Sequence, residues 1–204
     1  TMLLSYEERD RLEDLVRDLE ATTDAEVVLV LARRADNYLY APTLVAAIAG
    51  MLIPLISIYW PFWLDTNELV LVQATVFIGL ALLFRIPAIQ RKLVPKRTKF
   101  FRASNLAMRH FLAQGVHTTK NNLGIMIFVS EFERYIEIIA DHGITKKIGD
   151  ETWSKAIDLA IPLLKQNNAF NAFTSVLREV GGILQDKFPI TEEKEELPNH
   201  VILV

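Results

Sequence analysis

Cysteine is absent from the 204 residues, so the chain forms no disulfide, no cysteine–zinc site and no thiol nucleophile. A strong excess of either charge is absent as well, since 22 Lys and Arg against 25 Asp and Glu leave a net charge of −3. This balance gives no global argument for nucleic-acid binding. Apolar residues, by contrast, make up 51% of the chain, and the mean hydropathy is +0.23. Such a composition excludes a disordered chain.

Charge is distributed unevenly along the sequence. Residues 1–40 carry a net charge of −5, and residues 131–204 also carry −5. Between them, residues 41–84 contain no Lys or Arg, whereas residues 85–130 contain 9 basic residues and no Asp or Glu. A nearly uncharged block therefore separates an acidic N-terminal part from a basic stretch.

The uncharged block contains two long apolar runs, residues 41–64 with 24 uncharged residues and residues 69–84 with 16. Because about 20 apolar residues span the hydrocarbon core of a bilayer, we expect a transmembrane helical hairpin over residues 41–89. The second run reaches Ile89 if Arg85 snorkels to the surface. Aromatic residues typical of a membrane interface end the first run: Tyr59, Trp60 and Trp63. The alternatives are a hairpin buried in a soluble core and a tilted or re-entrant second segment.

Basic residues flank the two runs on one side only. The loop at residues 65–68 contains no Lys or Arg, whereas Arg33 and Arg34 precede the first run and seven basic residues follow the second by position 102. The positive-inside rule therefore predicts a protein of the bacterial inner membrane, with both termini and the soluble domain in the cytoplasm. Residues 1–25 contain no apolar segment of the kind found in signal peptides.

Two sets of residues in and near the hairpin are candidate contact sites. The basic flank is expected to meet anionic lipid or an acidic partner, and no aromatic-interleaved motif indicates nucleic acid. This set comprises Arg91, Lys92, Lys96, Arg97, Lys99 and Arg102. Small residues of the first run offer a surface that another helix can approach closely. This second set comprises Ala46, Ala47, Ala49 and Gly50.

The remaining sequence predicts helices and strands in alternation. A capping box, Ser5 with Glu8, opens a helix to about residue 21, and the Val-rich run 26–32 predicts a strand buried on both faces. Further segments are expected as a helix over 99–116, a strand pair over 123–140, a helix over 150–165 bent or interrupted at Pro162, and a helix from Asn168 or Asn171 to 187. In that last helix, Gly181 and Gly182 predict close helix packing.

Neither side of the hairpin can bury its strands alone, because the single strand at 26–32 needs the pair at 123–140. We therefore predict a discontinuous α/β domain, a sheet with helices on both faces, built from residues 1–40 and 90–190. The hairpin at 41–89 is an insertion, and residues 191–204 form an acidic and apolar C-terminal tail.

This order of segments resembles the TPM domain family over roughly residues 3–40 and 98–187. The resemblance rests on the opening LLSYEERDRLEDLVRDLEATTDAEVVLVLARRAD, the strand pair GIMIFVSEFERYIEIIADHGI, and the helical pair from Trp153 to Phe188. The ending EELPNHVILV is similar to the Asn-Glu-Leu-Pro-Asp ending of membrane-anchored bacterial members. The resemblance implies a small α/β/α fold. It implies either an acid phosphatase activity tied to photosystem repair, as in a plant relative, or an accessory role in membrane complexes.

Family members carry a Gly-x-Gly loop after the second strand of the pair and then an Asp that opens a helix. The matching residues here are Asp141, His142 and Gly143, followed by Asp150, with His142 in place of the first glycine. Two carboxylates and an imidazole near a helix start are suited to a divalent cation or a phosphate. The alternative is structural: Asp141 ends a strand, Gly143 adopts a positive φ, and Asp150 caps the helix.

Three observations weaken the case for catalysis. The family's acidic position near the last helix is replaced here by Asn168-Ala169-Phe170, which leaves a metal-assisted phosphatase with one carboxylate fewer. His110 and His117 lie seven residues apart and share a helix face only if the helix continues that far, so a surface or packing role is expected. No serine-nucleophile elbow, P-loop or dinucleotide fingerprint is present in the sequence.

The sequence therefore predicts a non-catalytic accessory or assembly subunit whose cytoplasmic domain docks on a larger membrane protein complex, photosynthetic or respiratory by family analogy. No cofactor is expected beyond a divalent cation. The alternative is a membrane-tethered, metal-dependent acid phosphatase or cation-binding domain that uses Asp141, His142 and Asp150.

Overall fold

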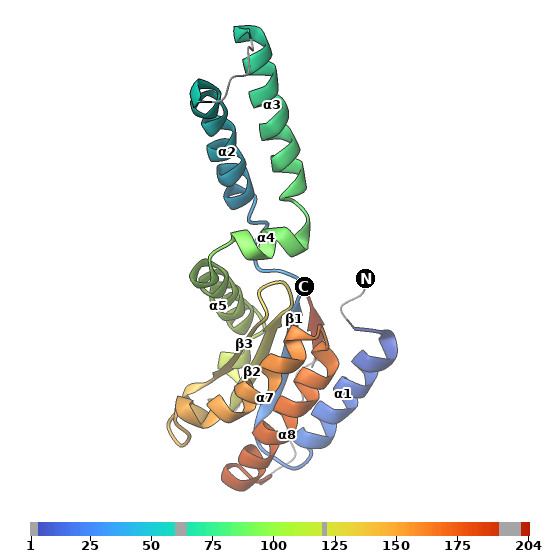
Figure 1. Cartoon of the computed structure of the whole chain (residues 1–204). Helices are drawn as coiled ribbons and strands as arrows, with labels where there is room; N and C mark the ends of the chain where they lie inside the picture. The colour runs from blue at the N-terminus through green and yellow to red at the C-terminus, as the bar shows by residue number, and fades with distance from the viewer. Residues whose placement is uncertain (1–3, 60–64, 120–121, 192–200) are drawn as a thin grey trace. The chain divides into compact units, whose positions relative to one another are not determined.

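The computed structural model of the chain describes residues 4–59, 65–119, 122–191 and 201–204, apart from the side chain of Asp150. The chain divides into two compact units. The first unit joins the N-terminal residues up to Ala35 with the segment from Phe100 onward, and it holds the sheet. The second unit, Asp36–Lys99, holds the two long apolar helices (Figure 1).

The helices of the chain include every helix that the sequence predicts. Their bounds are α1 Tyr6–Glu20, α2 Tyr40–Tyr59, α3 Thr66–Leu83, α4 Pro87–Leu93, α5 Lys96–Ala113, α6 His142–Thr145, α7 Ser154–Lys165 and α8 Ala169–Lys187, with two 3-10 helices at Val116–Thr118 (η1) and Asp150–Trp153 (η3). At α1 the Ser5–Glu8 capping box is present in full, with both reciprocal hydrogen bonds formed.

Four strands form one sheet in the order β3-β2-β1-β4. Their bounds are β1 Glu26–Ala32, β2 Gly124–Ser130, β3 Tyr135–Ala140 and β4 Val201–Leu203. β1 pairs with β2 in parallel and in register from Glu26 opposite Gly124 onward, while β2 and β3 form an antiparallel hairpin. The prediction that the first strand shares a sheet with residues 123–140 is therefore confirmed.

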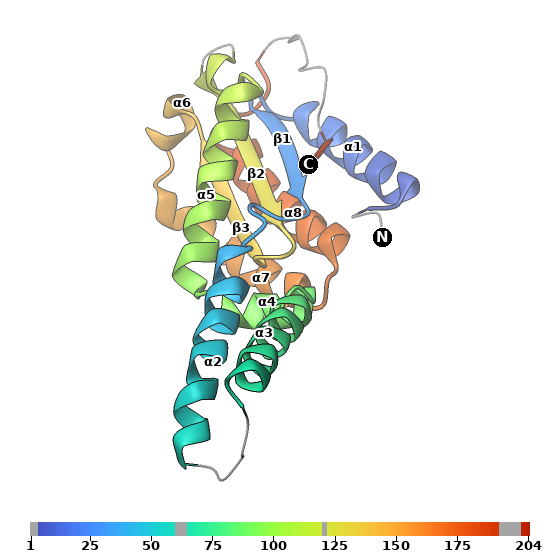
Figure 2. The same ribbon diagram turned by 90° about the horizontal axis from the view of Figure 1, so that it is seen from above.

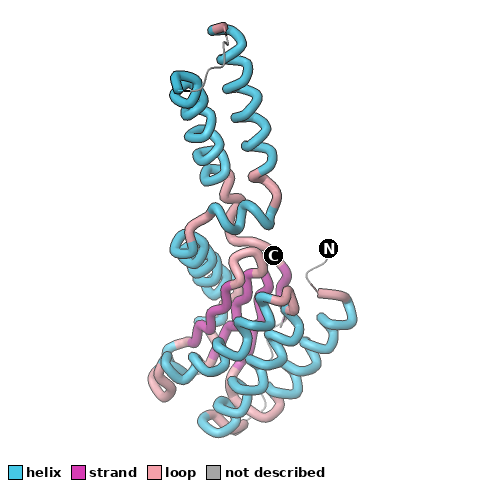
Figure 3. The backbone as a smooth tube through the Cα atoms, in the orientation of Figure 1, coloured by secondary structure: helices cyan, strands magenta, loops and turns pink. Residues whose placement is uncertain are grey.

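Both central strands are buried along their whole length, as their continuous apolar sequences require. Alternate residues point to opposite faces, so Val27, Leu29 and Leu31 join a core with α1, α7 and α8. Val28 and Val30 join a second core, on the other face, with α5. The sheet thus lies between helices on both sides (Figures 2 and 3), which confirms the predicted α/β class.

One predicted contact lies on the first face, between α8 and α1. A Cβ atom added at Gly181 would lie 2.9 Å from Leu19 Cδ1, so the glycine lets the two helices approach. At the neighbouring Gly182 a Cβ atom would meet nothing within 4 Å. The prediction of close packing is confirmed for Gly181 alone.

The strand β4 was not predicted, because residues 191–204 were interpreted as a tail. Its three residues pair in parallel with β1, with Leu29 opposite Val201. Two further hydrogen bonds continue the pairing, from the Arg33 amide to the Val204 carbonyl (2.8 Å) and from the Val204 amide to the Leu31 carbonyl (2.9 Å). The segment is too short to show a strand period, and its pairing partner is distant in sequence.

Three predicted boundaries differ from the structure. The helix expected over 99–116 begins earlier and ends at Ala113, because Gly115 adopts a left-handed conformation (φ 69°) and a separate 3-10 turn follows. The helix expected from Asp150 begins as a 3-10 helix, with Gly149 rather than Asp150 in the cap position. From Ser154 it continues through Pro162 to Lys165 as α7.

In the second unit, α2 and α3 run side by side as a helical pair, which we call the apolar hairpin (Figure 1). Both are long and apolar enough to cross a membrane, with mean hydropathies of 2.1 and 1.7. α3 begins at Thr66, earlier than the predicted apolar run, and a capping box formed by Asp65 and Glu68 marks its start. Part of the acidic loop therefore belongs to the helix. It ends at Leu83, and α4 follows as a separate helix rather than as the predicted extension of α3. Trp60 and Trp63 lie outside the described residues.

The small residues of α2 differ in their surroundings. Ala46 and Gly50 are buried, and a Cβ atom added at Gly50 would lie 3.5 Å from Cβ of Phe77 on α3. Ala47 and Ala49 are half-buried. Close packing at Gly50 therefore occurs within the apolar hairpin itself. At the base of the unit, the buried side chain of Gln90 on α4 donates to the Asn37 carbonyl (2.8 Å).

Candidate functional site

The candidate site lies where β1 and β2 begin and β3 ends. The Asp141 amide donates to the Gly124 carbonyl (2.8 Å), and the Glu26 amide donates to the Leu123 carbonyl (3.0 Å). These bonds fix the loop after β3 against the starts of the two central strands. The antiparallel β2–β3 pairing thereby brings Asp141, His142 and Gly143 to this edge of the sheet.

Asp141 acts as the N-cap of the short helix α6. Its Oδ1 accepts a hydrogen bond from the His142 amide (2.6 Å), and its Oδ2 is buried with no hydrogen-bond partner in the described part of the chain. The His142 residue is exposed. Gly143 lies within α6 and has no positive φ, so the structural role expected for it is wrong. Asp150 is the first residue of a 3-10 helix, and its side chain lies outside the described residues.

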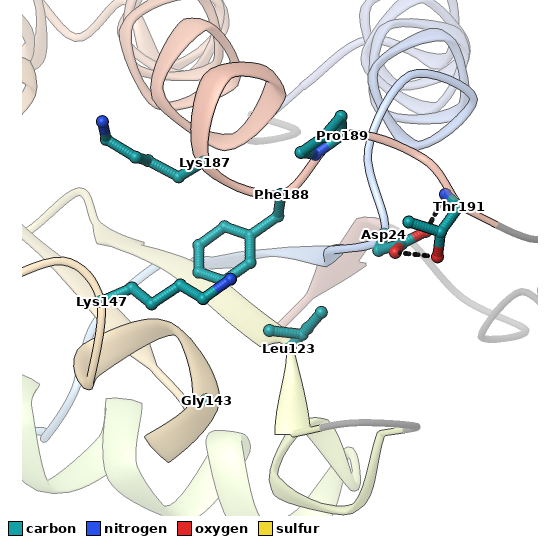
Figure 4. Close-up of a pocket in the computed structure, with 8 residues that line it drawn as sticks. All are labelled: Asp24, Leu123, Gly143, Lys147, Lys187, Phe188, Pro189 and Thr191. Carbon is teal, nitrogen blue, oxygen red and sulfur yellow. Dashed lines mark hydrogen bonds between the residues drawn. The ribbon is translucent and has the colours of Figure 1, made fainter.

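Next to α6 the structure contains a pocket of about 310 Å³ (Figure 4). Its apolar lining is provided by Leu123, Phe188 and Pro189, and Lys147 and Lys187 also line it. The remaining lining residues are Asp24, Gly143 and Thr191. Among the predicted candidate residues Asp141 and His142 do not line the pocket, although the adjacent Gly143 does.

The polar groups of the pocket are partly engaged with each other. Both carboxylate oxygens of Asp24 accept hydrogen bonds from Thr191, one from the amide (2.9 Å) and one from the hydroxyl (2.6 Å). The ammonium of Lys147 lies over the ring of Phe188, 4.7 Å from its centroid, in a cation–π contact. The ammonium of Lys187 instead pairs with Asp186 (2.9 Å). The pocket therefore presents the Lys147 ammonium and the Asp24 carboxylate over an apolar floor, and the Lys147 ammonium is the group that suits a small anion.

The described residues contain no group of three or more His, Asp or Glu side chains placed to hold a metal ion. Asp141 therefore belongs to no such group within the described part of the chain. Its buried Oδ2 is the single feature of this loop that suits a cation, and the contribution of Asp150 lies outside the described side chains.

A polar cluster between β3 and α5 was missed by the sequence analysis. The Ser104 hydroxyl donates to Glu137 Oε1 (3.1 Å), and Phe100 packs on Tyr135 with ring centroids 5.1 Å apart. Burial, followed by the charge of Glu137, raises the pKa of Tyr135 to about 12. The phenol is therefore protonated near neutral pH and is a poor candidate for a base. Alternation of polar and apolar residues along β3 is the only sequence signal for this cluster.

A buried carboxylate, Glu133, lies at the opposite end of β2 and was also missed. It accepts hydrogen bonds from the Ala35 amide (3.0 Å) and the Ser130 hydroxyl. Beside it, the Arg34 guanidinium lies 4.5 Å from the centroid of the Phe132 ring. These contacts fix the segment that leaves β1, which is a structural role.

The two histidines do not share a helix. His110 lies in the last turn of α5, whereas His117 lies in η1, beyond the left-handed Gly115. Burial, followed by the charge of Arg109, lowers the pKa of His110. The ring of His117 packs near Phe111, with centroids 6.1 Å apart.

The predicted basic residues fall on two consecutive helices. Arg91 and Lys92 lie in the last turn of α4, and the Lys99 ammonium donates to the Arg91 carbonyl (2.8 Å). The others, Lys96, Arg97, Lys99 and Arg102, lie on the N-terminal half of α5.

Comparison with known proteins finds a matching domain family. A family model described as the TPM domain matches residues 93–183, from the end of α4 into α8. This match confirms the resemblance to the TPM domain family inferred from the sequence. The solved NMR structure of the BA42 protein from the psychrophilic bacterium Bizionia argentinensis has a similar fold, with a TM-score of 0.62 at 18% identity over 100% of this chain and 97% of that one. A comparison with curated proteins finds no match.

Proposed function

We propose that the protein is a membrane-anchored accessory subunit whose TPM domain docks, in the cytoplasm, on a larger membrane protein complex. The observation that supports an anchor is the exposure of the apolar hairpin. The described protein buries no residue of the 18-residue apolar stretch of α3. It buries 22% of the corresponding stretch of α2. Large apolar side chains such as Met51, Ile58 and Leu71 are 67–73% exposed. Such surface is stable in lipid and unfavourable in water.

The same observation disfavours the alternative of a hairpin buried in a soluble core, because the described protein does not cover it. The docking role is proposed by analogy with accessory members of the TPM family, and a photosynthetic or respiratory partner rests on that analogy alone. Purification of the intact chain in mild detergent tests this role. The proposal requires the chain to migrate with a larger membrane complex, and migration as an isolated species would contradict it.

The orientation is open to a direct test with reporter fusions. A fluorescent protein fused after Val204 should be fluorescent in cells, and alkaline phosphatase at the same position should be inactive, because the basic flank retains that side in the cytoplasm. The matched control is a truncated fusion after Asp65, between the two helices, where phosphatase should be active. The reverse pattern would contradict the proposed orientation.

A second candidate function is a phosphate-directed or divalent-cation-directed activity. Two observations favour it: the unpaired, buried Oδ2 of Asp141, and the adjacent pocket that contains Lys147 and Lys187. In this case Asp141, His142 and Asp150 would hold a cation or a phosphate, with Lys147 neutralising the anion.

Hydrolysis of p-nitrophenyl phosphate by the purified chain, with Mg²⁺ or Ca²⁺ present, tests this second function. If the activity exists, Asp150→Asn should abolish it without lowering the melting temperature. Asp158→Asn, an exposed residue of α7 with the same change in charge, should leave it intact. Equal activity in both variants would remove Asp150 from the site, and an inactive wild-type chain would favour the docking role.

A further inference from the structure

The outward face of α5 carries an apolar stripe that no described part of the domain covers. Phe101, Met108 and Leu112 are 63%, 48% and 54% exposed. They lie seven and four residues apart, so they form one row along the helix. The opposite side of the same helix, with Ala103, Ala107 and Phe111, is buried against the sheet. Among the described helices of the domain, no other presents three exposed large apolar residues.

The stripe lies among positive charges. α5 contains no Asp or Glu and five Lys and Arg residues. Arg102 and Arg109, seven residues apart, form a second row beside the stripe, and Arg97 lies one turn before Phe101. An exposed helix with large apolar residues flanked by cations is typical of helices that lie in the interface of an anionic membrane.

The charge of the domain is opposite on the other side of the sheet. α1, which packs on the first core, has seven acidic and three basic residues, and Glu7, Asp10, Asp14 and Asp18 are exposed on it. The basic α5 and the acidic α1 pack on opposite faces of the sheet (Figure 2). An anionic surface therefore attracts α5 while it repels α1. Two copies joined through their α5 faces would instead bring the same cations together.

We infer that the outward face of α5 rests on the anionic lipid surface of the membrane. The inference builds on the proposed membrane anchor, because only 12 residues separate the end of α3 from the start of α5. In this position the apolar stripe enters the interfacial region and the arginines contact lipid phosphate groups. The face of α1, with its acidic residues, is left towards the cytoplasm and available to partners.

The absence of cysteine makes a single-site probe straightforward. The full chain with Asn105→Cys, an exposed position on the α5 face, would carry a fluorophore and be reconstituted in nanodiscs of phosphatidylglycerol or of phosphatidylcholine. In anionic discs we expect quenching by doxyl-labelled lipid and protection from aqueous iodide. The control Asp14→Cys on α1 should show the reverse in both disc types.

Two sets of variants separate the contributions of charge and apolar contact. Arg102→Gln with Arg109→Gln, and high salt on the unchanged chain, should abolish the lipid quenching. Phe101→Ser with Met108→Ser should reduce it, whereas Leu159→Ser, an exposed apolar residue of α7, should not. Equal iodide quenching at position 105 in both disc types would overturn the inference.

Other outcomes remain distinguishable. If position 105 is protected from iodide only in discs that hold two copies of the chain, and doxyl-labelled lipid does not quench it there, the stripe is covered by a second copy and the inference is wrong. A chain that does not enter discs contradicts the proposed anchor. A chain that enters discs but keeps position 105 in water contradicts the α5 inference alone.

Discussion

Replacing Val28 by Asp is expected to unfold the α/β domain. Val28 is 1% exposed, lies opposite Met126 in the β1–β2 pairing, and belongs to the core beneath α5. A carboxylate there would be buried without a described partner, which costs several kcal/mol and takes up most of the stability of an ordinary domain. The measurement is chemical denaturation of the purified chain in mild detergent, followed by near-ultraviolet circular dichroism.

Leu159→Asp is the matched control for Val28→Asp, because Leu159 is 46% exposed on α7. Its effect on the free energy of unfolding should lie within about 0.5 kcal/mol of zero. An unchanged denaturation curve for Val28→Asp would show that the first strand does not lie in the core.

The substitution Gly124→Ala is expected to have the second largest effect. A Cβ atom at this first residue of β2 would lie 2.0 Å from the Val116 carbonyl oxygen and 2.9 Å from its carbonyl carbon. Because the clash is with backbone, no side-chain rotation relieves it, and η1 or the start of β2 must move. We expect a loss of about 3 kcal/mol or more in the free energy of unfolding.

Gly149→Ala is the control for Gly124→Ala, since its Cβ atom would meet nothing within 4 Å and its φ is −69°. This substitution should be neutral or slightly stabilising. If the two variants melt at the same temperature, η1 does not pack on β2 in the way described.

Much of the fold could be predicted from the sequence, because its signals are local. The Ser5–Glu8 capping box marks the start of α1, and the Val-rich run 26–32 has the bounds of β1. Features that depend on distant residues were predicted less well. β4 has three residues and acquires its structure only by pairing with β1, and the end of α5 depends on a left-handed glycine.

The candidate site was predictable only in part, for the same physical reason. The loop with Asp141 and Gly143 follows a strand whose end is visible in the sequence, and the structure places it at the expected edge. The pocket beside it also draws on Asp24 and on residues near Phe188, which the chain folds together across more than 160 positions. A pocket lining assembled in this way has no spacing or motif that a single sequence reveals.

The position of β1 at the centre of the sheet has a consequence for synthesis on the ribosome. β1 is made early, yet both strands that pair with it, β2 and β4, are made later, and 91 residues separate β1 from β2. Translation proceeds at about 5–20 residues per second. The segment Glu26–Ala32, which has strong β-propensity, therefore remains unpaired for roughly 5 to 20 s. During that interval the apolar hairpin is also emerging. Nascent chains therefore expose a strand prone to aggregation, and folding of the domain depends on holding that segment apart until the later strands arrive.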